Sequence, residues 1–432
     1  MQAIPPESGQ RVLMVAPTPF FADRGCHVRI LGEAQALVAL GHAVLICTYH
    51  LGRDIPGLPT ERTLTVPWYH KLSAGPSVHK LYIDLLLIWK VLSACRRFRP
   101  TIIHAHLHEG IVIGRIASAL FGVPLVADLQ GSLTGELRDH KFIPGWLANT
   151  MHRIEWAINR MPRHLIVSST RTARSCHNTF RLPESRITPI MDGVDTNVFS
   201  PRERDSALRT SLGILPHETV VAFVGVLTEY QGIDLLLQAV PLVVKELPSA
   251  RFLIVGYPEE SYREKARALG IEASTLFTGR VPYHAVPDYL SLADIAISPK
   301  ISTTEANLKL FNYMAMGLPT VVFDNEVNRE ILGDLGIYVE SANVEALASA
   351  IVRILTSPVE AAELRRKSIE RARSEHSWLA VGRRLLDIYD EVRPDPGRRP
   401  RLRSEVSALA GYVPFVMESD CAYLSYLFSI FG

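Results

Sequence analysis

Short apolar runs rich in β-branched residues alternate with helical segments along most of this chain, and this alternation constrains the fold more than any other feature. Runs such as RVLMVAP (residues 11–17) and ARFLIVG (residues 250–256) are each long enough for one buried strand. The alternation occurs in two blocks, and 432 residues exceed the size at which one hydrophobic core stops growing. We therefore expect an α/β protein with two Rossmann-like domains that face each other across a cleft.

Cysteine usage and the lack of targeting signals favour the cytoplasm. The five cysteines are scattered without a CxxC pair, which argues against a disulfide framework and a zinc site. The first ten residues lack the basic and apolar parts of a secretion signal. The most apolar run, residues 81–94, is interrupted by Asp84 and Lys90 and is shorter than the ~18 residues of a membrane span. We expect it to form an amphipathic or buried helix.

Charge is unevenly distributed, although the net charge is only +2. Residues 1–195 contain 21 Lys and Arg against 14 Asp and Glu. This surplus leaves two interpretations open: the first half faces an anionic surface or acceptor, or the asymmetry is chance. The aromatic and apolar tail, residues 404–432, also leaves two interpretations open: it contacts a membrane or a partner, or it is a plain terminal extension.

The most informative single stretch is STTEANLKLFNYMAMGLPTVVFD, residues 302–324. Its polar start favours a loop, apolar residues then recur at helical spacing, and Gly317 and Pro319 end the helix before the short strand TVVF. Lys309 and Asn312 fall three apart and share one helix face. A helix that opens at the carboxyl edge of a parallel sheet suits a phosphate, so this face could hold a diphosphate and a sugar hydroxyl. An ordinary crossover with a solvated lysine is the alternative.

Three segments resemble glycosyltransferase family 4, and the resemblance covers roughly residues 11–390. KLFNYMAMGLPTVV (residues 309–322) resembles the family's donor-site motif. DGVDTNVF (residues 192–199) resembles the NGVDxxxF pattern that marks the passage between the two domains. TLFTGRVPYHAVPDYLSLADIAISPK (residues 275–300) resembles the family's FxGxVPxxxxPxxLxxADIxxxP pattern.

The resemblance implies the GT-B fold and a retaining transfer of a sugar from a nucleoside diphosphate to an acceptor hydroxyl, in envelope polysaccharide or glycolipid synthesis. It implies an acceptor-side domain over residues 1–195, a donor-side domain over 196–375, a helix over 376–392 that crosses back to the first domain, and a linker with a tail over 393–432. The expected partners are a nucleotide-sugar and a glycan or lipid-linked acceptor, with no nucleic acid. The expected location is the cytoplasm, with peripheral contact at the inner face of the membrane left open. No cofactor is required, and magnesium is possible but not implied.

The same resemblance assigns site residues. Catalytic roles fall on Lys309, Gln130 and Asp128, with Gln130 standing where many family members carry a histidine. His27 and His106 are expected on the acceptor side. The donor is expected to contact Gly25, Gly225, Arg280, Lys300, Glu305, Ala306, Asn307, Leu308 and Asn312.

The chain departs from the family pattern where the donor diphosphate is usually held. Val226 and Gln231 replace the usual Arg and Lys, and Asn312 replaces a Glu that bonds the donor ribose. Lys309, Lys300 or Arg280 could supply the missing charge. There are two alternatives to a replacement cation: a metal bridges the diphosphate, or the protein is catalytically impaired and still binds nucleotide-sugars. A nucleotide-sugar epimerase or a sugar phosphorylase would need catalytic groups that these motifs lack.

His104, His106 and His108 alternate after a predicted strand, which would place all three on one side of it. Three such histidines beside Glu109 could bind a metal. No further ligand cluster is visible in the sequence, so we expect a cleft wall and no metal.

Overall fold

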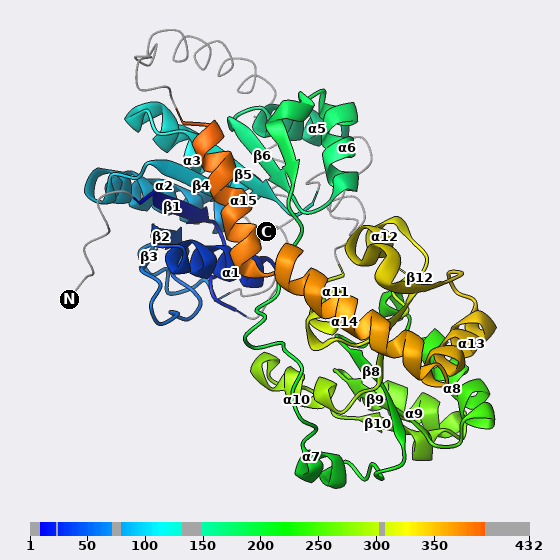
Figure 1. Cartoon of the computed structure of the whole chain (residues 1–432). Coiled ribbons are helices and arrows are strands. Elements are labelled where there is room, and N and C mark those ends of the chain that lie inside the picture. Colours follow the sequence, from blue (N-terminus) through cyan, green and yellow to red (C-terminus); the bar gives the residue numbers. More distant parts are fainter. Residues whose placement is uncertain (1–8, 23–24, 71–78, 132–147, 302–306, 394–432) are drawn as a thin grey trace. The chain divides into compact units, whose positions relative to one another are not determined.

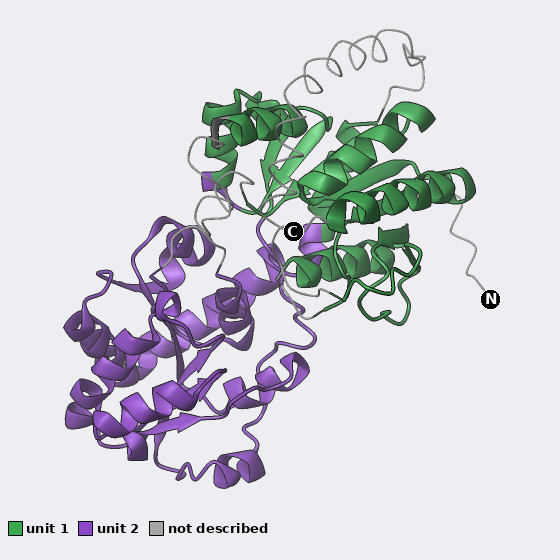
Figure 2. Cartoon of the chain, turned by 180° about the vertical axis from the view of Figure 1, so that it is seen from behind, with its two compact units in different colours: residues 1–168, 172–190, 382–432 green, residues 169–171, 191–381 purple. Residues whose placement is uncertain are grey.

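The computed structural model describes residues 9–22, 25–70, 79–131, 148–301 and 307–393 (Figure 1). They belong to two compact units, coloured separately in Figure 2. Unit 1 comprises the described residues within 1–168, 172–190 and 382–432, and unit 2 comprises those within 169–171 and 191–381. The chain thus passes from unit 1 to unit 2 after residue 190, whereas the sequence placed this boundary after residue 195.

Unit 1 is built on a seven-stranded parallel sheet with the order β3-β2-β1-β4-β5-β6-β7. Successive strands are added outward on one side of β1 and then, from β4, on the other side. The order therefore reverses between β1 and β4, as in doubly wound folds. The strands are β1 (Arg11–Ala16), β2 (Ala43–Thr48), β3 (Thr60–Arg62), β4 (Ile102–His106), β5 (Leu125–Leu129), β6 (His164–Val167) and β7 (Ile187–Pro189).

Helices cover both faces of this sheet. One face packs on α2 (His79–Phe98) and α3 (Leu107–Phe121), and it shares a core with α5 (Ala148–Asn159) and α6 (Thr170–Phe180). The other face, which carries His104, meets α1 (Gly25–Ala39) and α15 (Trp378–Glu391). The later part of α15 belongs to unit 1, where Gly382 lies against Ala36 and Tyr389 reaches His104. The predicted return of the chain to the first domain is confirmed.

Unit 2 repeats the plan with six parallel strands in the order β10-β9-β8-β11-β12-β13. Its strands are β8 (Thr219–Val224), β9 (Ala250–Val255), β10 (Thr275–Phe277), β11 (Ile295–Ser298), β12 (Thr320–Phe323) and β13 (Gly336–Val339). The order reverses between β8 and β11. Its α-helices are α7 (Ser206–Ser211), α8 (Ile233–Glu246), α9 (Glu260–Ala268), α10 (Val286–Ser291), α11 (Lys309–Met316), α12 (Glu326–Leu332), α13 (Val344–Leu355) and α14 (Pro358–Glu375).

Two parallel sheets, each wound on both sides, confirm the predicted α/β class with two Rossmann-like domains. The predicted helix over residues 81–94 lies within α2, which buries one face. None of the described helices is long and apolar enough to cross a membrane.

Helix α11 is fixed at the point where the strand order of unit 2 reverses. Gly317 adopts the left-handed conformation (φ 69°) that ends the helix, as predicted. The backbone N–H of Val224, at the end of β8, donates to the Tyr313 hydroxyl at 2.8 Å, and that hydroxyl donates to the Ile297 carbonyl of β11 at 3.4 Å. The first turn of α11 therefore lies at the carboxyl ends of β8 and β11.

Gly232 allows the short turn before α8, with Gln231 in it, to approach β11. Its φ is +75°, and a Cβ there would lie 1.9 Å from the Pro299 carbonyl oxygen. Gly213 has a similar φ of +70° with nothing within 4 Å of its would-be Cβ.

Gly213→Ala should cost about 1 kcal/mol of unfolding free energy through backbone strain alone, whereas Gly232→Ala should cost roughly 3 kcal/mol or more because backbone must move. Urea unfolding of the two variants measures this, and equal losses would contradict the close approach.

Candidate functional site

A pocket of about 250 Å³ lies in unit 2, at the carboxyl ends of β8 and β11 and the start of α11. A switch point of this kind is where doubly wound sheets bind ligands. Five of the predicted donor-contact residues and the predicted catalytic Lys309 meet here, although they come from three segments of the chain. The lining residues are Val224, Gly225, Gln231, Lys300, Asn307, Leu308, Lys309 and Asn312.

Lys309 supplies a buried ammonium group to this pocket. Its Nζ donates to Gln231 Oε1 at 2.6 Å and lies 4.1 Å from the centre of the Phe223 ring. The side chain reaches solvent only in part. Burial lowers the pKa of Lys309 well below its ordinary value, and the positive charge of Lys300 adds to this effect. An ammonium held this way gains most from an anion that enters the pocket.

Gly225 makes room for that ammonium. A Cβ at this position would lie 3.0 Å from Lys309 Nζ, and the φ of +148° disfavours any other residue. Gly225 therefore leaves room in the pocket, and Lys309 lies where a side chain at position 225 would otherwise be.

The start of α11 is fixed by an amide network. Asn307 Nδ2 donates to Asn328 Oδ1 at 2.9 Å and to Ser298 Oγ at 3.0 Å, and Asn328 Nδ2 donates to the Phe323 carbonyl at 2.8 Å. Since the Asn307 side chain is engaged in this way, the backbone amides near Leu308 are the groups this segment can offer to a ligand. No side chain among the described residues caps α11 at Leu308.

Asn312 is hydrogen-bonded by a residue that the sequence analysis missed. The Tyr283 side chain bonds Asn312 and packs against Phe199, with 5.2 Å between the ring centres. Tyr283 lies inside the matching segment 275–300, but nothing in its sequence position indicated this contact.

One predicted donor residue of unit 2 lies elsewhere. Arg280 is outside the pocket lining, where its guanidinium lies 5.2 Å from the centre of the Tyr257 ring. Of the three cations proposed to replace the missing pair, Lys309 and Lys300 line the pocket. Glu305 and Ala306 lie outside the described residues.

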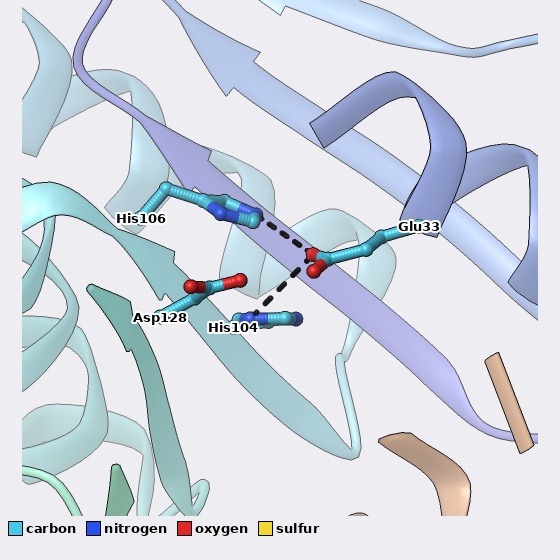
Figure 3. Close-up of side chains that lie close together, drawn as sticks. All are labelled: Glu33, His104, His106 and Asp128. Atoms are coloured by element: carbon cyan, nitrogen blue, oxygen red, sulfur yellow. Dashed lines mark ion pairs between the residues drawn. The ribbon is translucent and has the colours of Figure 1, made fainter. Parts of the chain in front are cut away.

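The predicted residues of unit 1 include two members of a buried polar cluster, drawn in Figure 3. Glu33 of α1, His104 and His106 of β4 and Asp128 of β5 have exposed side-chain fractions of at most 1%. Glu33 Oε2 lies 4.0 Å from His104 Nε2 and 3.9 Å from His106 Nε2.

Arg29 and Tyr389 complete this cluster. Arg29 Nε donates to Asp128 Oδ2 at 2.7 Å and lies 3.2 Å from Glu33 Oε1, while the Tyr389 hydroxyl and His104 Nδ1 are 2.6 Å apart. Their partners tie α1, β4, β5 and α15 together. The ligand atoms of Glu33, His104, His106 and Asp128 all lie within 4.8 Å of one another, which would suit a metal. Arg29 already provides a cation to both carboxylates, and the absence of a metal stays a prediction.

Two expectations about histidines were wrong. His108 does not continue the alternation of His104 and His106, because β4 ends at His106 and Leu107, with φ +63°, turns the chain into α3. His108 instead lies 3.6 Å from Glu155. The second expectation, that no further ligands accompany these histidines, was wrong because Glu33 and Asp128 come from distant segments.

The remaining predicted residues of unit 1 are placed as follows. His27 is fully buried, and it bonds Thr18 and the Ala22 N–H. Gly25 is the first residue of α1. Gln130 follows β5, and its Nε2 is buried without a partner among the described residues. The catalytic roles of Gln130 and Asp128 and the acceptor role of His106 stay predictions.

Burial sets the charge state of the cluster. It lowers the pKa of His106 to about 4 and that of His104 well below its ordinary value. Burial alone would raise the pKa of Asp128, but Arg29 together with the neighbouring His106, Glu33 and His104 outweighs it and holds that pKa at about 2. The histidines are therefore neutral and the aspartate ionised at neutral pH.

These shifts predict acid sensitivity. A histidine whose pKa is depressed by folding binds fewer protons in the folded than in the unfolded chain, so its contribution to stability is complete above pH 6.5 and is lost towards pH 4. The loss from His106 should reach about 3 kcal/mol. His106→Gln should flatten the fall in melting temperature between these pH values, whereas His217→Gln, at an exposed position, should not. Parallel profiles for both variants would contradict this assignment.

Comparison with known proteins follows the same two-part division. A family model described as "Glycosyl transferase 4-like domain" matches residues 24–193, and one described as "Glycosyl transferases group 1" matches residues 218–357. The chain is 27% identical over 389 residues to a D-inositol 3-phosphate glycosyltransferase of Rhodococcus erythropolis, covering 84% of this chain and 86% of the relative. It is 24% identical to the sulfoquinovosyl transferase SQD2 of Arabidopsis thaliana, covering 85% and 71%.

Solved structures share the fold at low identity. Anabaena Alr3699/HepE in complex with UDP superposes with a TM-score of 0.70 at 18% identity, covering 88% of this chain and 100% of that one. Sucrose-phosphate synthase from Thermosynechococcus elongatus gives 0.69 at 19% identity, covering 88% and 98%. WaaG, described as a glycosyltransferase involved in lipopolysaccharide biosynthesis, gives 0.63 at 15%, covering 88% and 99%.

Proposed function

This chain belongs to glycosyltransferase family 4 and has the GT-B fold, and we propose that it transfers a sugar from a nucleoside diphosphate to an acceptor hydroxyl with retention of anomeric configuration. The observation that carries the proposal is the pocket of unit 2, where Lys309 and Lys300 converge beside the start of α11. The complex of the similar Anabaena protein with UDP supports a nucleoside diphosphate as the donor group.

The two lysines take over the role of the missing cation pair. In the transfer, the bond between the anomeric carbon and the diphosphate breaks, and the leaving diphosphate gains negative charge. A desolvated ammonium stabilises that charge by several kcal/mol. Gln231 Oε1 accepts a hydrogen bond from Lys309 Nζ at 2.6 Å. Gln231 occupies the position of the usual family lysine, and it orients Lys309, which takes over the role of that lysine.

The remaining chemistry needs no protein nucleophile. The acceptor oxygen bonds the anomeric carbon on the face that the diphosphate leaves, and its proton passes to a diphosphate oxygen. The protein positions the groups and neutralises charge. Backbone amides near Leu308 contact the phosphates, and Asn312, bonded by Tyr283, holds a donor hydroxyl.

The proposed acceptor is a glycan or lipid-linked hydroxyl in polysaccharide or glycolipid synthesis on the cytoplasmic side. The similar proteins SQD2, named a sulfoquinovosyl transferase, and WaaG, named a glycosyltransferase of lipopolysaccharide biosynthesis, support this class of acceptor. A catalytically impaired nucleotide-sugar-binding protein is the second candidate, because Val226 and Gln231 depart from the family pattern.

Removing the Lys309 ammonium should abolish most turnover. Lys309→Ala is expected to lower the rate at saturating donor by 10²- to 10³-fold, because a preorganised charge at the leaving group is lost. Lys245→Ala, at an exposed lysine on α8 of the same unit, should leave the rate unchanged. Donor-sugar hydrolysis and transfer to a panel of acceptors measure the rate without added metal.

The outcomes separate the two candidates. Full turnover by Lys309→Ala would refute the assigned role. A donor that raises the melting temperature of the parent chain without any turnover would favour the impaired protein.

At pH values above the depressed pKa of Lys309 in the free protein, donor binding should take up a proton. The pKa of Lys309 is depressed in the free protein and should rise when a diphosphate enters, so affinity should fall as pH rises between these two pKa values. A nucleotide-sugar is the suitable probe because its diphosphate has no group that titrates near neutrality. Calorimetric titration in two buffers of different ionisation enthalpy would count the protons. Lys309→Arg keeps the charge but cannot titrate, and should bind without uptake.

A further inference from the structure

Helix α2 of unit 1 carries two apolar faces, and only one of them is buried. Its buried residues enter the core of unit 1: Ile83, Leu87, Val91, Ala94 and Cys95. On another face Leu81, Leu85 and Trp89 recur every four residues with exposed fractions of 59%, 66% and 59%. Large apolar side chains that form a continuous exposed stripe indicate an interaction surface.

A second tryptophan extends this stripe. Trp68 is 69% exposed, and its Nε1 donates to the Tyr82 hydroxyl of α2 at 3.0 Å. Trp68 is thereby held beside the first turn of the helix. We call Trp68, Leu81, Leu85 and Trp89 the α2 surface.

The segment of the chain that carries the α2 surface is rich in basic residues. Residues 60–99 contain seven Lys and Arg and two acidic residues, Glu61 and Asp84. Part of this charge is paired: Glu61 lies beside Lys90 and Arg97, Glu109 beside Lys80, and Asp54 beside Arg62. Asp84 accepts a 2.6 Å hydrogen bond from Tyr49. The end of α2 presents Arg96, Arg97 and the following Arg99 to solvent.

We infer that the α2 surface docks unit 1 on an anionic lipid bilayer, with α2 lying along the membrane plane. Tryptophan prefers the boundary between headgroups and acyl chains, leucines enter the acyl region, and each basic residue near an anionic surface adds about 1 kcal/mol. The helix has 20 residues but does not qualify as a span, so it lies on the membrane rather than crossing it. A second copy of the chain would oppose one basic surface with another, which disfavours a symmetric dimer.

This inference goes beyond the proposed transfer and does not depend on it, because vesicle binding needs neither donor nor turnover. The α2 surface belongs to unit 1 and the donor pocket to unit 2. Docking by unit 1 would nevertheless serve a lipid-linked acceptor, since a membrane-bound enzyme meets such a substrate at its own surface.

The test is flotation of the purified full chain with vesicles of phosphatidylcholine alone or with about one third phosphatidylglycerol. We expect flotation only with the anionic vesicles, weakened by salt. The triple variant Leu81→Ser, Leu85→Ser, Trp89→Ser should lose at least tenfold in partitioning. Arg96→Glu with Arg99→Glu should lose a similar factor.

A matched variant controls for general loss of exposed apolar groups. Leu215→Ser, Leu269→Ser, Val359→Ser removes three exposed apolar side chains from unit 2 and should float like the parent. An unchanged melting temperature shows that the α2 variants fold, since the altered side chains are exposed.

Three results would overturn the inference. If the α2 triple variant floats as much as the parent, the exposed apolar stripe is not the membrane contact. A concentration-dependent dimer that the triple variant abolishes, without vesicle binding, would assign the surface to a second copy. Equal acrylamide quenching of the parent and Trp89→Phe in vesicle-free monomer would show Trp89 covered by another segment of this chain.

Discussion

Parallel strands must be joined by crossovers, and the site of this protein depends on where the crossovers change sides. In both units the strand order reverses, between β1 and β4 in one and between β8 and β11 in the other. The loops that leave two such neighbouring strands go to opposite faces and leave space at the carboxyl edge of the sheet. In unit 2 that space is the pocket around Lys309. In unit 1 buried polar side chains gather on β4 and the adjoining β5, where Arg29 and Asp128 pair.

The two buried cations illustrate two ways of keeping charge inside a protein. Arg29 is compensated within the fold by Asp128 and Glu33, so it stabilises the packing of α1 on the sheet and needs no ligand. Lys309 has a neutral partner, Gln231, and a cationic neighbour, Lys300, within the pocket. A carboxylate in place of Gln231 would satisfy the lysine and compete with a diphosphate. The amide orients the ammonium and leaves its charge for the ligand.

Much of this arrangement could be predicted from the sequence because it is local. The order of loop, helix, glycine end and strand around residues 309–323 follows from apolar spacing and from Gly317, and the structure has α11 and β12 there. Contacts between distant segments could not be predicted in the same way. Glu33 joins His104 and His106 only because α1 packs on β4, and Tyr283 reaches Asn312 only because the turn before α10 lies against α11. The error at His108 arose because one residue with positive φ, Leu107, ends an alternation that the sequence alone continues.

Helix α2 shows where amphipathic pattern ceases to be informative. Residues 81–94 are apolar on almost every side, and the sequence allowed either a buried or an amphipathic helix. A helix in contact with a sheet through one face can bury only part of its circumference, so Leu81, Leu85 and Trp89 stay in water unless something covers them. Folding of unit 1 alone gives no reason for three large apolar residues at a four-residue spacing on that face. Contact with an apolar phase gives one, and the adjacent arginines select an anionic boundary over a neutral one.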